Sequence, residues 1–232
     1  MENAKPDHNP IAQKSFFMHF IIETPDTRAP ERDYILSVIL CEFLGLEWQR
    51  LPSDRKDIRI TLQGHQGEIL LPDILFQTPD AAWLTPESLP PRPLSVWETR
   101  NAAIDCPLVH SHLPVIYGDL DFPEKFKSVE KKSMALPLDI FGSAFFMLTR
   151  YEEVVKPERD EHNRFPAWAS LAFQENFLDR PIINEYLEIL WFYIQALVQL
   201  NGLTEPVPNC CTCPHSVSKD QQSRETQKPM EV

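Results

Sequence analysis

The spacing of apolar residues changes along the chain, and each change predicts a different element. Residues 16–22 form a short apolar run that predicts a first strand. From residue 31 the apolar positions recur at helical spacing, which predicts an amphipathic helix over 31–44 that Gly45 ends. Residues 58–62 alternate with period two, and residues 68–71 are apolar again after a glycine-containing turn. This pattern is typical of a β-hairpin.

Proline and charge dominate the middle of the chain. Residues 77–93 are rich in proline and predict an irregular covering loop. Two short apolar runs, 94–97 and 113–117, are predicted strands. The lysine-bearing segment 121–134 is interpreted as a solvated loop that binds no ligand.

Two more helices are predicted in the second half of the chain. Asp139 is placed to cap a helix over 139–155, and a polar loop over 157–164 follows it. The last helix is expected to begin with Asp179 as its cap and to run to about Leu200. Its second half is apolar almost all the way round, and a helix of this pattern must be covered on most sides.

These elements predict an α/β or α+β fold, with a small mixed sheet flanked by about three principal helices. One folded domain is expected over residues 16–203. Residues 1–15 are polar and are predicted to be a disordered N-terminus. Residues 204–232 lack apolar periodicity and are predicted to be a disordered tail.

Composition narrows the class of protein. The 232 residues include 43% apolar side chains, enough for a core of normal size, and a net charge of −12 disfavours binding to nucleic acid. No run approaches the ~18 apolar residues that a membrane span needs, and the apolar patch before Ile22 lacks the features of a secretory signal. Cys41 and Cys106 stand singly in apolar surroundings, as thiols of cytoplasmic proteins do, so a cytoplasmic location is expected.

Five stretches together resemble one known family, the uncharacterised domain that precedes a polysaccharide deacetylase domain in bacterial proteins of exopolysaccharide or surface-glycan loci. They are residues 69–76 (ILLPDILF), 113–118 (LPVIYG), 136–153 (LPLDIFGSAFFMLTRYEE), 160–166 (DEHNRFP) and 177–186 (FLDRPIINEY). The resemblance covers roughly residues 31–200, and the stretch 136–153 is its most specific part.

The resemblance implies a non-catalytic accessory domain followed, soon after Leu200, by a metal-dependent carbohydrate esterase domain. Such enzymes are similar in using an Asp-Asp pair and a His-x-x-x-His motif to hold a divalent metal that activates water. This sequence contains neither motif, so the chain is interpreted as an isolated N-terminal half from a truncated or frameshifted gene. No catalytic residue, metal or cofactor is predicted. The expected partner is the missing deacetylase domain, or a second copy, through the 182–200 helix.

One polar cluster is the candidate site of the sequence. Its members are Arg150, Glu152, Glu153, Asp160, His162 and Arg164. They could line a cleft that binds a sugar or an anion, or that hydrolyses a substrate. The favoured interpretation is structural, because ion pairs that cap a helix and hold a loop produce the same residue pattern.

Other chemistry-bearing residues are weaker candidates. His110 and His112 could present two ligands from one face of a strand, but no third ligand accompanies them. Cys210, Cys211, Cys213 and His215 are residue types that bind zinc, at a spacing that is poor for an ordered site. Trp83, Trp97, Trp168 and Trp191 could stack on sugars, although core packing is favoured, and Trp48 has no assigned role.

Overall fold

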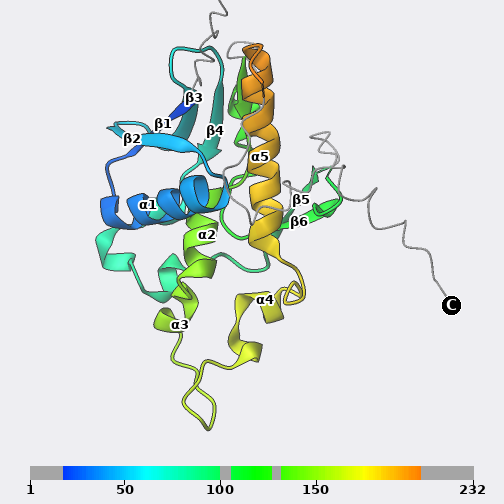
Figure 1. The fold of residues 1–232 in the computed structure, drawn as a ribbon. Helices are drawn as coiled ribbons and strands as arrows, with labels where there is room; N and C mark the ends of the chain where they lie inside the picture. Colours follow the sequence, from blue (N-terminus) through cyan, green and yellow to red (C-terminus); the bar gives the residue numbers. More distant parts are fainter. Residues whose placement is uncertain (1–17, 100–105, 127–131, 205–232) are drawn as a thin grey trace, which may run out of the picture.

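The computed structural model describes residues 18–99, 106–126 and 132–204, and Figure 1 draws the rest as a grey trace. Within these ranges the chain forms a five-stranded mixed sheet, a separate two-stranded sheet and several helices. The mixed α/β class predicted from the sequence is confirmed. The predicted disordered ends, residues 1–15 and 204–232, lie outside the described residues apart from Thr204.

The main sheet has the strand order β2-β1-β3-β4-β7. Its strands are β1 (His19–Pro25), β2 (Glu47–Ser53), β3 (Asp57–Leu62), β4 (Glu68–Pro72) and β7 (Ser133–Ala135). The central pairs β1–β3 and β3–β4 are antiparallel, whereas the edge strands β2 and β7 run parallel to β1 and β4. The two-stranded sheet consists of β5 (Ser95–Glu98) and β6 (His112–Val115).

Side chains of opposite character face the two sides of the main sheet, because successive residues of a strand point to opposite faces. One face is apolar and buried. It includes Phe20, Ile22, Ile58, Ile60 and Ile69. The opposite face presents half-buried residues from the same strands. They include Ile21, Glu23, Arg59, Thr61 and Glu68. The core therefore lies on one side of the sheet only.

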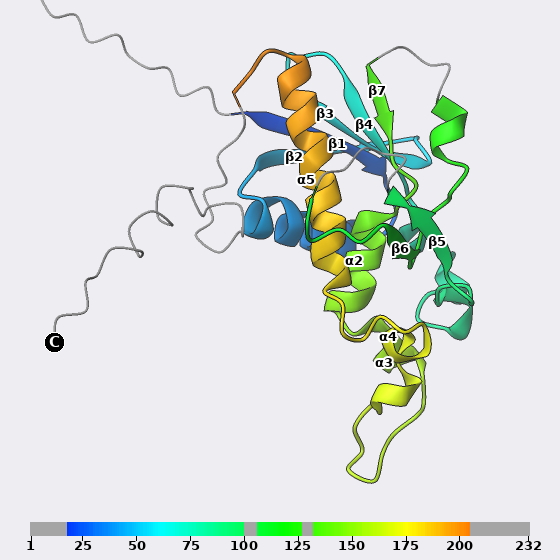
Figure 2. The same ribbon diagram turned by 90° about the vertical axis from the view of Figure 1, so that its right-hand side faces the viewer.

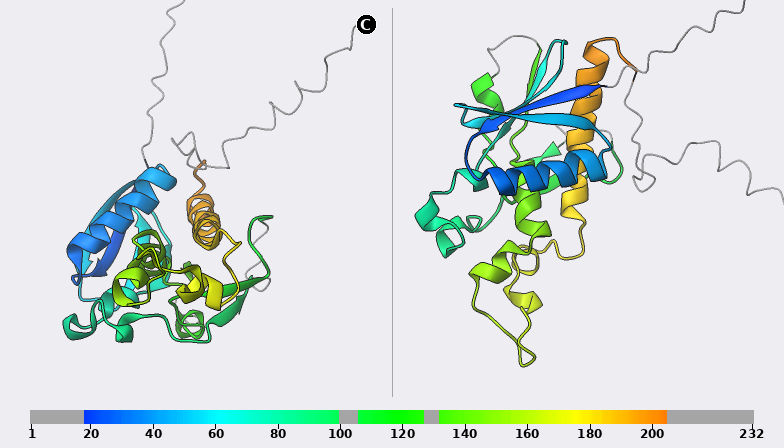
Figure 3. Two further views of the ribbon diagram at one scale, coloured as in Figure 1. Left: turned by 90° about the horizontal axis from the view of Figure 1, so that it is seen from below. Right: turned by 60° about the vertical axis from the view of Figure 1, so that its left-hand side comes forward.

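Helices pack on the apolar side of the main sheet or extend from that layer to the far end of the domain. They are α1 (Ala29–Leu36), continued by a π-helical segment η1 (Ser37–Phe43), then α2 (Ile140–Leu148), α3 (Tyr151–Val155), α4 (Leu171–Gln174) and α5 (Ile182–Leu200). α2 contacts both α1 and α5, and seen from below it lies between them (Figure 3). α3 and α4 lie at the end of the domain away from the main sheet (Figures 1 and 2).

A buried charge network joins α1, the end of β4 and the start of α2. The Arg32 guanidinium donates to both carboxylate oxygens of Asp73, at 2.9 and 2.6 Å, and these side chains are 1% and 0% exposed. Asp139 accepts from the N–H groups of Ile74 and Leu75 with one oxygen and from that of Gly142 with the other, at 2.8–3.0 Å. Asp73 and Asp139 belong to two of the five resemblance stretches, 69–76 and 136–153, and both have an architectural role here.

Several predicted elements are confirmed. The helix over 31–44 corresponds to α1 and η1, and Gly45 follows with a φ of +63°. The 58–62 and 68–71 hairpin corresponds to β3 and β4, and the runs 94–97 and 113–117 correspond to β5 and β6. The predicted cap Asp139 does accept a hydrogen bond in the first turn of α2. Gly142 makes this possible, because a Cβ there would lie 2.3 Å from the Asp139 carboxylate.

Other predictions are wrong in detail. The single helix over 139–155 is divided into α2 and α3, because Arg150 adopts a left-handed conformation with a φ of +57°. Asp179 is exposed and does not cap α5; the cap position is Pro181, whose ψ of 64° is not helical. The strand β2 was not predicted, and β7 lies inside the segment 121–134 that was interpreted as a loop.

The last helix is covered on most sides, as its apolar pattern requires, and the cover comes from within this chain. Twelve of the nineteen residues of α5 are buried within this chain. The helix packs on α2 and β4, and its C-terminal residues Leu197 and Leu200 approach the hairpin at Gly67, where a Cβ would lie within 3 Å of both side chains. The expectation that α5 needs cover from a missing domain is therefore corrected for most of its length.

Candidate functional site

Arg150 and Glu153, two members of the predicted polar cluster, form an exposed ion pair on α3. The guanidinium of Arg150 donates to both carboxylate oxygens of Glu153, at 2.6 and 2.5 Å, and this pairing raises the pKa of Arg150. A bidentate pair between residues three positions apart on one helix is a structural arrangement.

Glu152 points the other way, into the domain. Its carboxylate accepts from the N–H of Leu171, at 2.9 Å, and from the ammonium of Lys156, also at 2.9 Å. Lys156 in turn donates to the carbonyl of Ala169. Glu152 therefore holds the start of α4 against the end of α3.

The remaining three members form a closed turn in the protruding loop that follows α3 (Figures 1 and 2). Asp160 accepts from the N–H groups of His162 and Arg164 and from the Arg164 guanidinium, at 2.8–3.0 Å. The N–H of Arg164 lowers the pKa of Asp160. His162 is exposed and lies 3.4 Å from Glu161. The six residues thus divide into three local groups, and none of them lines the cavities described below.

The other predicted candidates are scattered. His110 and His112 are both exposed; the His110 N–H donates to the buried Glu185, and the ring of His112 contacts the Ser111 hydroxyl. The part of the chain that the structure describes holds no group of three or more His, Cys, Asp or Glu side chains placed to bind a metal ion. Cys210, Cys211, Cys213 and His215 lie outside the described residues.

Most of the tryptophan side chains pack against the core and are buried or half-buried. Trp191 is buried in α5, and Trp83 stacks near Phe76 with the guanidinium of Arg28 over its ring. Trp48 and Trp97 are half-buried against the core. Trp168 differs from these four, because 57% of its surface is exposed.

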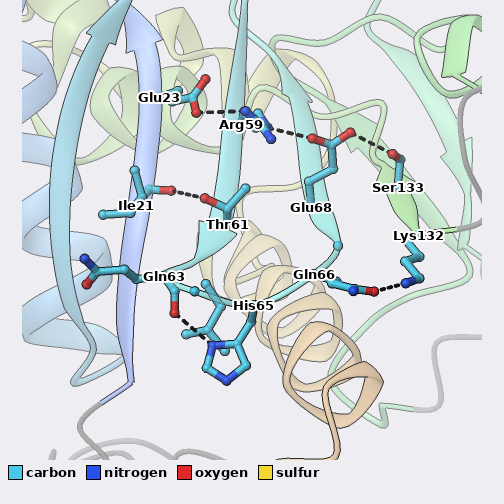
Figure 4. A pocket seen from close by; sticks show the side chains of 13 residues that line it. Ile21, Glu23, Arg59, Thr61, Gln63, His65, Gln66, Glu68, Lys132 and Ser133 are labelled. Carbon is cyan, nitrogen blue, oxygen red and sulfur yellow. Dashed lines mark hydrogen bonds and ion pairs between the residues drawn. The ribbon is translucent and has the colours of Figure 1, made fainter.

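A wide cavity that the sequence did not predict lies on the open face of the main sheet. It has a volume of about 630 Å³, and we call it the polar hollow. Its lining comes from β1, β3, β4, β7 and the β3–β4 turn: Ile21, Glu23, Arg59, Thr61, Leu62, Gln63, Gly64, His65, Gln66, Gly67, Glu68, Lys132 and Ser133. Figure 4 shows these side chains projecting from neighbouring strands toward one space.

A row of charged and polar groups crosses the polar hollow. Arg59 donates to Glu23 at 2.8 Å and to Glu68 at 2.6 Å, and the Ser133 hydroxyl donates to Glu68 at 2.7 Å (Figure 4). Burial alone would raise the pKa of Glu68, but the hydrogen bonds from Ser133 and Arg59 outweigh it and lower that pKa. Burial alone would lower the pKa of Arg59, and the two glutamates outweigh it in the same way.

The end of α5 is fixed to the rim of the polar hollow. The Asn201 side chain accepts from the backbone N–H of Gln66 and donates to its carbonyl, at 2.9 and 2.8 Å. Lys132 donates to the side chain of Gln66 from the opposite side (Figure 4). The hairpin that forms the floor of the hollow is thus held between β7 and α5.

A signal for this site was present in the sequence. Arg59 and Thr61 occupy alternate positions of the predicted strand 58–62. Because the side chains of a strand alternate between its two faces, both residues are expected to face away from the core. The predicted first strand stopped at Ile22, before Glu23, and Ser133 fell within a predicted loop. Only the strand pairing, which places Glu23 opposite Arg59 and Glu68 opposite Ser133, assembles the row.

A second exposed surface lies at the other end of the domain. We call it the apolar tip and define it as Trp168, Phe173 and Leu178, which are 57%, 50% and 58% exposed. Phe173 and Leu178 share a shallow cavity of about 500 Å³ with Asn176 and Asp179. Large apolar side chains exposed within a short segment of chain are candidates for a protein–protein contact.

The fold and these two surfaces define a single α/β domain with an open polar sheet face and an exposed apolar end. The chain belongs to a family of unknown function (DUF7033), whose pattern matches residues 20–199. No curated protein and no solved structure matches it. The expected membership of an uncharacterised family is thereby confirmed in its coarse form, and the link to polysaccharide deacetylases stays a prediction. No described helix is both long and apolar enough to cross a membrane.

Proposed function

We propose that this domain is a non-catalytic accessory domain that docks against a polysaccharide deacetylase domain, and that the apolar tip is the docking surface. The observation that carries the proposal is the exposure of three large apolar side chains within eleven residues of chain, Trp168, Phe173 and Leu178. Exposed aromatic and leucine side chains of this size gain most from being covered by a partner.

The tip replaces the surface expected from the sequence. The 182–200 helix was the predicted contact, but most of α5 is already occupied by its own domain. The tip precedes α5 directly and lies on short elements, α4 and the 3₁₀ helix η7 (Ala167–Ala169). These elements bury Ala169, Leu171 and Ala172 but leave the larger side chains of Trp168 and Phe173 exposed.

The hydrogen bonds and ion pairs that the residues of the predicted polar cluster make support a non-catalytic function. A hydrolase would need an acid, a base or a nucleophile within hydrogen-bond reach of one substrate position. Glu152 is committed to Leu171 and Lys156, whereas Glu153 pairs with Arg150 on the surface. The Asp160 carboxylate accepts hydrogen bonds within its own turn.

The test is direct binding between this chain and a separately expressed deacetylase domain, taken from a protein in which the two domains share one polypeptide. We expect isothermal titration calorimetry to detect a complex with a Kd on the order of 1–10 μM. The triple variant Trp168→Ser/Phe173→Ser/Leu178→Ser should weaken it at least tenfold. Leu200→Ser is the matched control, because Leu200 is also an exposed leucine but lies at the far end of α5.

Two results would overturn the proposal. One is that no complex forms, or that the triple variant binds the deacetylase domain as tightly as the wild type does. The other is release of acetate from N-acetylated oligosaccharides by this chain alone, lost in Glu153→Gln, which would favour the hydrolase alternative. Self-association through the tip would appear as a concentration-dependent dimer in analytical ultracentrifugation and would replace the deacetylase domain as the partner.

A further inference from the structure

We infer that the polar hollow is a binding site for a neutral, hydroxyl-rich ligand, of which a short glycan segment is the natural class. The inference goes beyond docking at the apolar tip and does not depend on it. The hollow is bonded to the residue after α5, the tip precedes α5, and nineteen helical residues separate them by about 28 Å.

The size of the polar hollow suits a small ligand. Its volume of about 630 Å³ falls in the middle of the range of roughly 300–1,000 Å³ that small-molecule sites occupy. It lies on the sheet face that no helix of the described residues covers, with a floor of regular strands. Strands position side chains more rigidly than loops do.

The charges of the hollow cancel, and this selects a neutral ligand. Glu23 and Glu68 oppose Arg59 and Lys132 across the lining. An anion placed there would meet the two carboxylates, and a cation would meet the guanidinium and the ammonium. A neutral ligand meets neither penalty, so the arrangement discriminates against charged ligands of both signs.

The hydrogen-bonding groups that remain available are both donors and acceptors. Within the described residues, Arg59 uses Nε and one terminal nitrogen, which leaves Nη2, and Glu23 uses one carboxylate oxygen, which leaves the other. The Gln63 side-chain amide, which has both kinds of group, makes no hydrogen bond to a described residue. A hydroxyl group is at once a donor and an acceptor, so a row of hydroxyls matches such a lining.

The hollow has no aromatic wall. The ring of His65 is the sole aromatic group among its lining residues, and Ile21 and Leu62 supply the apolar contacts. Binding must therefore depend on hydrogen bonds in a site that is partly open to water, where each bond contributes little. We expect a Kd on the order of 1 mM for one isolated ligand, and a clear gain when several copies of the domain face a polymer.

The experiment is a two-dimensional NMR titration of the full chain with five probes. Three are neutral oligosaccharides, namely cellopentaose, chitopentaose and maltopentaose. The other two are an anionic pentamer of galacturonic acid and a cationic pentamer of glucosamine. At least one neutral probe should shift the amide signals of β3, β4 and the turn between them, with little shift at the tip, and both charged probes should bind at least fivefold more weakly.

Matched variants test the site itself. Arg59→Met should weaken binding of the neutral probe at least fivefold. Arg92→Met, which removes an exposed arginine paired with Glu175 outside the hollow at the same 2.6 Å, should leave it unchanged. Gln63→Arg adds bulk and charge to the hollow without removing a described bond, so it tests the site even if Arg59→Met unfolds.

Three outcomes would contradict the inference. If no neutral probe binds, if a charged probe binds best, or if Gln63→Arg and Arg59→Met both bind as the wild type does, the inference is overturned. Docking at the tip is read separately, through the deacetylase-domain complex and the Trp168 triple variant, so the two proposals fail independently.

Discussion

Two arginines on opposite sides of the main sheet illustrate how one residue type serves two purposes. Arg32 lies on the helix side, 1% exposed, with its guanidinium bonded to Asp73 and to the carbonyl and hydroxyl oxygens of Thr27. Arg59 lies on the open side, 34% exposed, between Glu23 and Glu68. Both are ion-paired at 2.6–2.9 Å, so distance alone does not distinguish them.

The difference lies in what surrounds each pair. Around Arg32 every neighbour belongs to the protein, and removing one partner would leave a charge buried without compensation. Around Arg59 water can replace a lost partner, so the same ion pair contributes little to stability. The side chain that stabilises least is the one with hydrogen-bonding capacity left for a ligand. The comparison therefore assigns architecture to the Arg32 side, whereas the Arg59 side keeps the hydrogen-bonding capacity on which the proposed binding rests.

The largest expected effect is the loss of Arg32. Arg32→Met keeps the length of the side chain but leaves the Asp73 carboxylate buried beside Asp139. We expect the free energy of unfolding to fall by about 3–5 kcal/mol, measured by urea denaturation followed by circular dichroism. The double variant Arg32→Met/Asp73→Asn should recover part of this loss. A loss below 1 kcal/mol for Arg32→Met would mean that the buried pair is not structural.

The pH dependence of stability tests the buried side of the main sheet, where Asp139 lies near Asp73. Burial first, and the charge of Asp73 second, raise the pKa of Asp139 to about 6 from an ordinary 3.8. The folded domain therefore holds this proton more tightly than the unfolded chain does. The stability that this provides is complete below about pH 4 and is lost as the pH rises through about 6. A shift of roughly 2 pKa units corresponds to about 3 kcal/mol.

Asp139→Asn, which is neutral at every pH, should remove this slope. The variant loses part of the cap of α2, but between pH 4 and pH 7 its stability should improve relative to the wild type by up to about 3 kcal/mol. The other titratable groups near Asp139 are Asp73, Tyr117 and Tyr186. Burial raises the pKa values of the two tyrosine hydroxyls, so they do not titrate in this range. A difference between wild type and variant that stays constant from pH 4 to pH 7 would contradict the assignment.

The adjacent glutamates of α3 provide a smaller, internally controlled comparison. Glu152→Ala removes the acceptor of the Leu171 N–H and the partner of Lys156, and we expect a loss of about 1–3 kcal/mol. Glu153→Ala removes a surface pair and should change stability by less than about 0.5 kcal/mol. Thermal unfolding monitored by circular dichroism would separate the two. Equal effects would show that the neighbouring residues share one environment.

The sequence predicted elements well where local chemistry decides them. The period-two pattern of 58–62 and the cap Asp139 depend on neighbours a few residues away. Prediction from the sequence failed where residues distant in the chain decide whether an element forms. β2 and β7 are edge strands with little apolar periodicity of their own, and each exists because it pairs with a central strand.

The candidate site was missed for the same reason. The predicted cluster around Arg150 and Asp160 is local in sequence, but its members divide into separate groups: Arg150 pairs with Glu153, Asp160 bonds within its own turn, and Glu152 bonds to Leu171. The polar hollow brings together Glu23, Arg59 and Ser133, the first and last of which are 110 residues apart in the chain, through pairing that no local pattern encodes. Alternation along a strand could show that Arg59 faces outward, but not what it faces.

The expected effect of Arg59 on stability is also small, and it completes the comparison. Arg59→Met should lower the free energy of unfolding by less than about 1 kcal/mol, because the ion pairs with Glu23 and Glu68 are open to solvent. Raising the salt concentration to 1 M should shrink even this difference, since exposed pairs are screened. The control is Arg32→Met, whose large effect should persist in salt. If Arg59→Met proved as costly as Arg32→Met, the open face would be a part of the core framework. The polar hollow would then be a consequence of packing rather than a site with capacity left for a ligand.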